Sequence, residues 1–142
     1  MNRNMVFVVL LFVGGVLSAC SSMGSMKGSS SDLISTLTKQ LAVTNAQAEG
    51  GTGSILALAQ QKLAAGDFDL IAKAIPGSDK YLGMAKQLLG GAKITDKAGL
   101  QSAFSMFGMS SDMVGKFAPI VTDYVGKAGG DRAKNLLAGV LK

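Results

Sequence analysis

Apolar residues recur at every third or fourth position from Asp32 to the end of the chain, with polar residues between them. The first such segment carries its apolar residues at Leu33, Ile34, Leu37 and Leu41. This spacing places the side chains on one face of an α-helix, where they can be buried together. No segment alternates apolar and polar residues as a half-buried strand would. The pattern therefore predicts an all-α fold for residues 32–142.

Capping residues and glycines divide this pattern into helices. Asp32 begins the first helix, and Thr44 with Gln47 three residues later forms the capping-box pattern that opens the second. The later breaks that we expect are Gly66 before a helix capped by Asp67, Pro76-Gly77 before Ser78 or Asp79, Gly90-Gly91 before Thr95 or Asp96, Gly108 before Ser110 or Ser111, and Gly129-Gly130 before Asp131. Pro119 lies four residues after Gly115, so a kinked but continuous helix can contain it. We expect a compact bundle of about six or seven short helices.

Three glycines, Gly50, Gly51 and Gly53, interrupt the second helical segment. Each glycine destabilises a helix interior by about 1 kcal/mol relative to alanine. Two explanations stay open: the helix breaks at these glycines, or another backbone packs tightly against them. The segment from Gly51 to Ser54 could also present backbone amides to an anion, but it lacks the Gly-Lys-Ser/Thr of a phosphate-binding loop. We favour close helix packing.

The chain begins with a short polar segment that contains Arg3, and an uninterrupted apolar run follows from Met5 to Leu17. A membrane-spanning helix needs about 20 apolar residues, so this run has instead the length of a signal-peptide core. The run ends in Leu17-Ser18-Ala19-Cys20, and Cys20 is the only cysteine. These four residues resemble the bacterial lipobox.

The resemblance to a lipobox implies that residues 1–19 are a lipoprotein signal peptide that is removed. Cys20 then becomes the first residue and carries a diacylglycerol and acyl chains such as palmitate. The lipidated cysteine and the Ser/Gly-rich residues after it, 20–31, would form a flexible tether. Ser21 and Ser22 follow the cysteine, which in the enteric sorting pattern favours transfer to the outer membrane. The alternatives are an uncleaved anchor and a secreted protein with one free thiol.

Removal of residues 1–19 would leave 13 of the 14 basic side chains and all 9 acidic ones, a net charge of +4. The lysines are spread along the sequence, which favours a solvated surface, although a basic exported protein can also contact anionic lipid headgroups or lipopolysaccharide. Nucleic acid is not an expected partner, because export separates the protein from it. With Cys20 lipidated, no thiol remains for a disulfide, so the domain must be stable through packing alone.

Residues for acid–base or nucleophilic catalysis are scarce. The chain has no histidine, its cysteine is assigned to the lipid, and Glu49 is its only glutamate. Asp67 and Asp69 are the nearest carboxylate pair, but two residues apart on a helix they point to different sides. Most other aspartates lie at expected helix starts, where carboxylates cap helices. We therefore expect no enzyme activity and no cofactor.

Methionines and phenylalanines cluster in the last third of the chain. The residues are Phe104, Met106, Phe107, Met109, Met113 and Phe117. We favour an ordinary core around Gly108, because these residues largely fall on core-facing positions. Two alternatives stay open: an adaptable groove for a lipid, a small apolar ligand or a partner helix, and thioether binding of cuprous ions. We expect no resident metal.

Two helix corners share the order large, small, apolar and hydroxyl, Leu41-Ala42-Val43-Thr44 and Phe107-Gly108-Met109-Ser110. The run from Leu37 through Pro76-Gly77, together with the second corner and the pattern of Met113, Phe117-x-Pro119 and Tyr124 up to Gly129-Gly130, resembles the VcgC/VcgE-type domain of unknown function of exported bacterial proteins. The resemblance covers most of residues 32–142. It implies the fold and the cellular setting, and it brings no catalytic residues.

Taken together, these features favour a non-enzymatic envelope lipoprotein whose helical domain is a protein-interaction or structural module. Its expected partners are the membrane, through Cys20, and a protein of the envelope, while the oligomeric state stays open. We expect it on the outer membrane, facing the periplasm. The alternative is a membrane-tethered carrier that binds a small apolar ligand or a lipid in a groove lined by methionine and phenylalanine.

Overall fold

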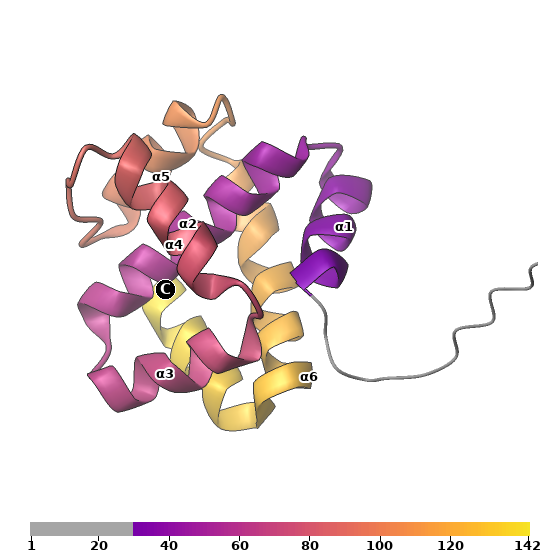
Figure 1. Ribbon diagram of the computed structural model, residues 1–142, viewed down its shortest axis with the longest axis vertical. Coiled ribbons are helices and arrows are strands. Elements are labelled where there is room, and N and C mark those ends of the chain that lie inside the picture. Colours follow the sequence, from indigo (N-terminus) through magenta and orange to yellow (C-terminus); the bar gives the residue numbers. More distant parts are fainter. Residues whose placement is uncertain (1–29) are drawn as a thin grey trace, which may run out of the picture.

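The computed structural model of the protein describes residues 30–142. The predicted signal peptide, the lipobox and most of the tether, residues 1–29, lie outside the described residues. The described part folds into six α-helices and contains no strand, which confirms the all-α prediction. The helices are α1 (Ser30–Leu41), α2 (Asn45–Lys62), α3 (Ala65–Ala74), α4 (Ser78–Leu88), α5 (Lys97–Met106) and α6 (Met113–Leu141). Figure 1 shows them gathered around α2, which contacts all five of the others.

The middle of α2 is buried on every side, since every residue from Gly50 to Ala59 is buried. The helix continues through Gly50, Gly51 and Gly53 without a break. A side-chain carbon added at Gly53 would lie 2.6 Å from the carbonyl carbon of Tyr81 in α4, whereas carbon atoms pack at about 3.5–4.0 Å. The helix therefore does not break at the glycines, and at Gly53 the close packing of another backbone is the correct explanation.

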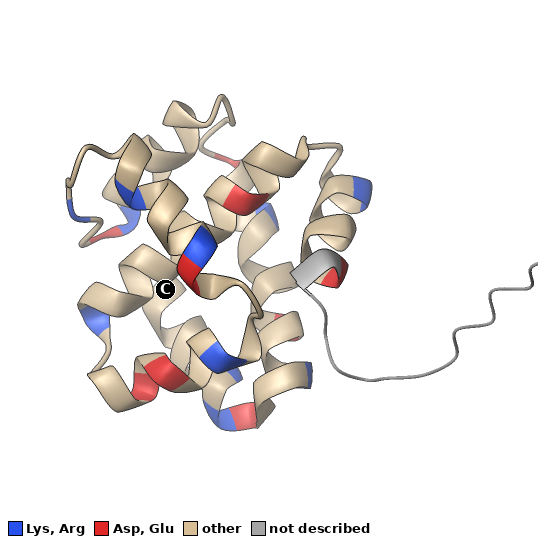
Figure 2. Ribbon diagram, viewed as in Figure 1, with Lys and Arg blue, Asp and Glu red and all other residues tan. Residues whose placement is uncertain are grey.

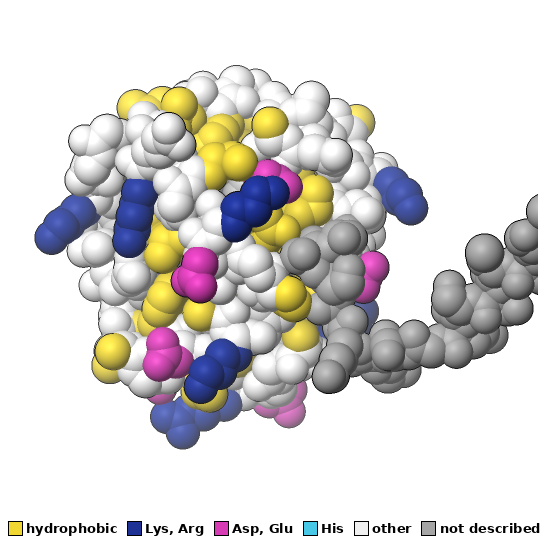
Figure 3. All heavy atoms as spheres, in the orientation of Figure 1, with side chains coloured by type: hydrophobic (Ala, Val, Ile, Leu, Met, Phe, Trp, Pro, Cys, Tyr) yellow, Lys and Arg dark blue, Asp and Glu magenta, His cyan; other side chains and the backbone are white. Residues whose placement is uncertain are grey.

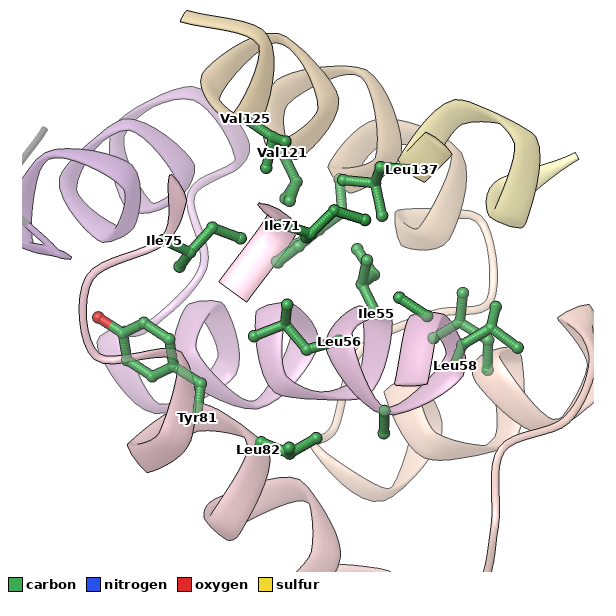
Figure 4. Close-up of a cluster of buried hydrophobic side chains, with 14 of the residues drawn as sticks. Ile55, Leu56, Leu58, Ile71, Ile75, Tyr81, Leu82, Val121, Val125 and Leu137 are labelled. Atoms are coloured by element: carbon green, nitrogen blue, oxygen red, sulfur yellow. The ribbon is translucent and has the colours of Figure 1, made fainter. Parts of the chain in front are cut away.

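The same glycines leave room for aromatic rings from the last third of the chain. A side-chain carbon at Gly50 would lie 2.5 Å from Cζ of Phe107, and one at Gly51 would lie 2.6 Å from Cε1 of Phe117. Phe117 packs edge-to-face on Phe104, with ring centroids 5.0 Å apart, which is a preferred arrangement of aromatic pairs. Aliphatic side chains close the rest of the core around α2 (Figure 4): Ile71, Ile75, Leu82, Val121, Val125 and Leu137. Among the described residues, side chains from all six helices thus contribute to one core.

The capping box predicted at the start of α2 is present. The Gln47 backbone amide donates to the Thr44 hydroxyl at 3.2 Å, and the Thr44 amide donates to the Gln47 side-chain oxygen at 3.0 Å. Asp96 caps α5 as expected, because its carboxylate accepts the Gly99 amide at 2.7 Å. α4 begins at Ser78, which is also as expected.

α1 begins at Ser30, so Asp32 lies in its first turn and, contrary to expectation, does not begin it. The predicted boundary between α2 and α3 is also wrong. The chain leaves α2 after Lys62, and Ala64 is the N-cap of α3, so Gly66 does not separate the two helices. The amides of Asp67 and Phe68 both donate to the Ala64 carbonyl, at 3.0 and 2.9 Å. Asp67 therefore lies in the first turn of α3 and is not its cap.

The start of α6 is also later than predicted. The amide of Met113 donates to the Ser110 carbonyl at 3.0 Å, and that of Val114 donates to the Ser111 carbonyl at 3.3 Å. These bonds form one tight turn ahead of the helix. The N-cap is therefore Asp112, and neither of the two serines that we expected takes that position.

α6 is a hairpin of two helical arms. Pro119 lies inside the first arm without ending it, as predicted. Gly130 has φ 84° and ψ 175°, a conformation available essentially only to glycine, and the chain turns there (Figure 1). Lys134 of the second arm pairs with Asp123 of the first at 3.1 Å. The predicted break at Gly129-Gly130 is therefore confirmed.

One side chain connects the two similar corners. Ala42 and Gly108 occupy equivalent places in them and both have left-handed backbone, with φ of 53° and 73°. The Gln47 side-chain amide donates to the carbonyls of Phe107 and Gly108, at 3.2 and 3.3 Å. Because Gln47 also closes the capping box with Thr44, it ties the α1–α2 corner to the α5–α6 corner.

Candidate interaction site

A cleft of about 300 Å³ opens between α1, α2 and α4, and we call it the α1–α4 cleft. It is lined by Ile34, Ser35, Asn45, Glu49, Gly77, Lys80 and Tyr81. Ile34 and Tyr81 are nearly completely buried, whereas Ser35 and Asn45 are exposed. Figure 3 looks onto this face and shows hydrophobic side chains at the surface on both sides of charged ones. The cleft therefore combines an apolar wall with a polar rim.

Glu49 and Lys80 form an ion pair at the α1–α4 cleft, with 2.9 Å between Nζ and Oε1. The Glu49 side chain is 19% exposed and that of Lys80 is 65% exposed. The hydrogen bond to Glu49, and then its negative charge, raise the pKa of Lys80. The ammonium also lies 5.8 Å from the centroid of the Tyr81 ring. Because the Lys80 end of this ion pair is exposed to solvent, the pair adds little to the stability of the fold.

The packing of α4 on α2 brings the two charges together. Gly77 has a left-handed backbone, with φ of 79°, and turns the chain into α4, so that Lys80 lies in the first turn of that helix. Gly53 lets the backbone of α4 approach α2 closely at Tyr81, the residue after Lys80. This approach places Lys80 within reach of Glu49, which stands one turn before Gly53 on α2.

A second cleft, of about 180 Å³, opens on the other side of α1, and we call it the α1–α6 cleft. It is lined by Leu33, Thr36, Gln40, Ile120, Asp123, Tyr124 and Lys127. Burial, and then the negative charge of Asp32, raise the pKa of Tyr124. α1 therefore lies between two clefts.

A third cleft, of about 330 Å³, lies between the end of α2 and the second arm of α6 and is lined by Lys62, Leu63, Asn135, Leu136, Gly139 and Val140.

The cluster of methionines and phenylalanines extends from the core to the surface. Phe104 and Phe117 are completely buried, and Met109 is 5% exposed. Phe107 and Met113 are partly buried against the core, and only Met106 is largely exposed, at 57%. None of these residues lines the three clefts described above. Most of the cluster thus belongs to the core, and the apolar groove stays a prediction.

Four carboxylates of the described residues engage a cation or an amide, those of Glu49, Asp67, Asp96 and Asp123. Asp67 pairs with Arg132 at 3.0 Å, Glu49 with Lys80, and Asp96 caps α5. Among residues 30–142, no group of three acidic, histidine or cysteine side chains is placed to hold a metal ion. Within the same residues, no helix combines the length and the apolarity needed to cross a bilayer.

The residues of the α1–α4 cleft were not predicted as a site. Glu49 stood out in the sequence only as the single glutamate, and Lys80 lies 31 residues away from it. No motif links two positions on different helices at that separation. The one signal was Gly53, since a glycine inside a helix marks a place where a neighbouring backbone comes close.

Comparison with known proteins identifies the family of the chain. The family model described as protein of unknown function VcgC/VcgE (DUF2780) matches residues 17–142. No curated protein and no solved structure matches the chain. The match includes all six helices and both similar corners. The chain therefore belongs to the VcgC/VcgE family of proteins of unknown function.

Proposed function

We propose that the protein is a non-enzymatic lipoprotein of the bacterial cell envelope whose helical domain docks a protein partner at the α1–α4 cleft. In this proposal residues 1–19 are removed, Cys20 carries the lipid, and residues 20–31 tether the domain to the outer membrane on its periplasmic side. The observation that carries the proposal is the place of the cleft. It is formed by α1, the first helix after the tether, together with α2 and α4.

The chemistry of the cleft supports a protein partner. Protein interfaces combine an apolar centre with a polar rim, and here Ile34 and Tyr81 are bordered by the exposed Ser35 and Asn45. The Glu49–Lys80 pair adds two opposite charges that a partner can engage. Asp67, Asp96 and Asp123 serve in ion pairs or a helix cap, and Glu49 is the one carboxylate among the residues that line the cleft, which supports binding over catalysis.

Native mass spectrometry of the protein extracted gently from its own membranes tests the anchor. We expect a mass that begins at Cys20 and includes a diacylglyceryl group. A Cys20→Ala variant should keep residues 1–19 or leave the membrane fraction. An unmodified Cys20 with residues 1–19 still attached would contradict the proposal.

A photo-crosslinking residue placed at Ser35 in cells tests the docking site. We expect a discrete adduct with one identified envelope protein, and a Glu49→Lys variant should weaken it because the charge at the cleft is reversed. The matched control is the same residue at Lys73, an exposed position on α3 outside the three clefts. Equal adducts at both positions, no adduct at Ser35, or an adduct unaffected by Glu49→Lys would each count against the site.

A further inference from the structure

Three exposed lysines lie on one edge of the domain, which we call the α4–α5 edge and define as residues 86–97. Lys86 is in the last turn of α4, Lys93 is in the connection, and Lys97 is the first residue of α5. Figure 2 shows the blue segments at the end of α4, in the loop after it and at the start of α5 on the same side of the molecule. The fold therefore keeps the three cations of this one segment on the same side of the molecule.

The positive charge of the α4–α5 edge is not neutralised by ion pairs. Among the described residues the ion pairs join Lys80 to Glu49, Arg132 to Asp67 and Lys134 to Asp123. Lys86, Lys93 and Lys97 take part in none of them. Asp96 is the one acidic residue of the edge, and its carboxylate accepts the Gly99 amide as the cap of α5. The edge therefore keeps an excess of positive charge.

The α4–α5 edge also presents an apolar side chain on an ordered turn. Leu88 is 45% exposed, one of the two large hydrophobic residues that stand out in this way among the described residues. The turn after it is held by the Gly91 amide, which donates to the Lys86 carbonyl at 3.2 Å, and by Ile94, which is buried in the core. Most other residues of the edge are exposed. Leu88 thus lies between Lys86 and Lys93 in the sequence, at the exposed end of α4.

We propose that the α4–α5 edge contacts the surface of an anionic phospholipid bilayer, with the three lysines at the headgroup phosphates and Leu88 in the interface. None of the three clefts includes these lysines. A small anion or a single acidic side chain would therefore find no described pocket at the edge. Lysines around an exposed apolar residue suit a charged planar surface, where electrostatic attraction and burial of the leucine act together. This contact goes beyond the docking of a protein at the α1–α4 cleft.

Vesicle co-sedimentation of residues 21–142, which contain the whole core, tests the proposal without the lipid anchor. The probes are vesicles of phosphatidylglycerol mixed with phosphatidylcholine, and vesicles of phosphatidylcholine alone. A lysine near an anionic surface contributes about fivefold to binding. We therefore expect the triple variant Lys86→Gln, Lys93→Gln and Lys97→Gln to bind the anionic vesicles about 100-fold more weakly than the unmodified protein.

The matched control is the triple variant Lys39→Gln, Lys73→Gln and Lys116→Gln, which changes the net charge equally at exposed lysines outside the ion pairs. It should lose much less affinity. A Leu88→Ser variant should bind several-fold more weakly, and circular dichroism should confirm that every variant stays folded. Equal losses in the two triple variants, equal binding to both kinds of vesicle, or no binding to either would overturn the proposal. It would also be overturned if the Lys86, Lys93 and Lys97 triple variant lost binding to an acidic protein partner but bound the vesicles as well as the unmodified protein.

Discussion

Replacing Gly53 by alanine tests whether α2 and α4 pack backbone to backbone. The new Cβ would lie 2.6 Å from the carbonyl carbon of Tyr81 and 3.2 Å from Cβ of Ala85, whereas carbon atoms pack at about 3.5–4.0 Å. The helices must therefore separate by about 1 Å at this point. No side-chain rotation relieves the clash, because the nearest obstacle is the backbone of α4.

The expected cost follows from two opposing effects. Overpacking a core costs about 1–3 kcal/mol and occasionally more, and the upper end applies here because a fully buried interface must open. Alanine restores about 1 kcal/mol of helix propensity. We therefore expect Gly53→Ala to lower the free energy of unfolding by about 2–3 kcal/mol.

Urea unfolding followed by circular dichroism measures this loss. Gly83→Ala is the control, because a Cβ at Gly83 on α4 meets no atom within 4 Å, and it should raise stability by up to about 1 kcal/mol. Gly50→Ala should cost less than Gly53→Ala, since the partly exposed ring of Phe107 can move aside. A Gly53→Ala protein as stable as the unmodified one would refute the close contact between α2 and α4.

Four further predictions concern single residues. Ala42→Gly should raise the free energy of unfolding by about 0.5–1 kcal/mol, because φ of 53° is left-handed and strained for alanine; a loss of stability in urea would refute this. Gly130→Ala should lower it by about 1–3 kcal/mol, since φ of 84° with ψ of 175° requires glycine, and an unchanged urea midpoint would count against the turn. In Glu49→Gln the pKa of Lys80, followed by NMR, should fall toward its ordinary value, and an unchanged pKa would exclude the ion pair. Burial raises the pKa of Tyr124 above its ordinary value of 10.0 in the folded protein. The unfolded chain therefore loses this proton first, and the free energy of unfolding falls as the pH rises above that value. Tyr124→Phe should show a smaller fall in unfolding curves measured at alkaline pH, and an equal fall would contradict the raised pKa.

Local chemistry made most of the helix boundaries predictable. Thr44 and Gln47 form their capping box whatever surrounds them, because both partners lie within one turn. Gly130 breaks α6 through its own backbone conformation. The start of α3 was missed because Ala64 caps that helix with its backbone alone and has no polar side chain to mark it. Boundaries marked by a capping side chain or a glycine could thus be predicted, whereas the start of α3 could not, because no residue type marks it.

The surfaces proposed for binding depend on which helices become neighbours. Glu49 and Lys80 meet only because α4 crosses α2 at Gly53, and the sequence does not say which backbone fills the space at that glycine. The lysines of the α4–α5 edge already lie within one short segment of the sequence, but only the fold shows that all three stay exposed on one side. Tertiary packing created the Glu49–Lys80 pair and decided the exposure of the three lysines, so periodicity and composition could not reveal either feature.

The burial of the middle of α2, Gly50 to Ala59, limits where the domain can contact other molecules. All five other helices pack on α2, and the rings of Phe107 and Phe117 occupy the spaces at Gly50 and Gly51. Changes in this buried stretch or in these rings should therefore alter stability and binding together. Changes at the rim of the α1–α4 cleft or on the α4–α5 edge should alter binding alone, because those side chains contribute little to the core. A substitution scan that measures both stability and binding would separate the two groups. A rim residue whose substitution lowered both would have to be reassigned to the packing of the fold.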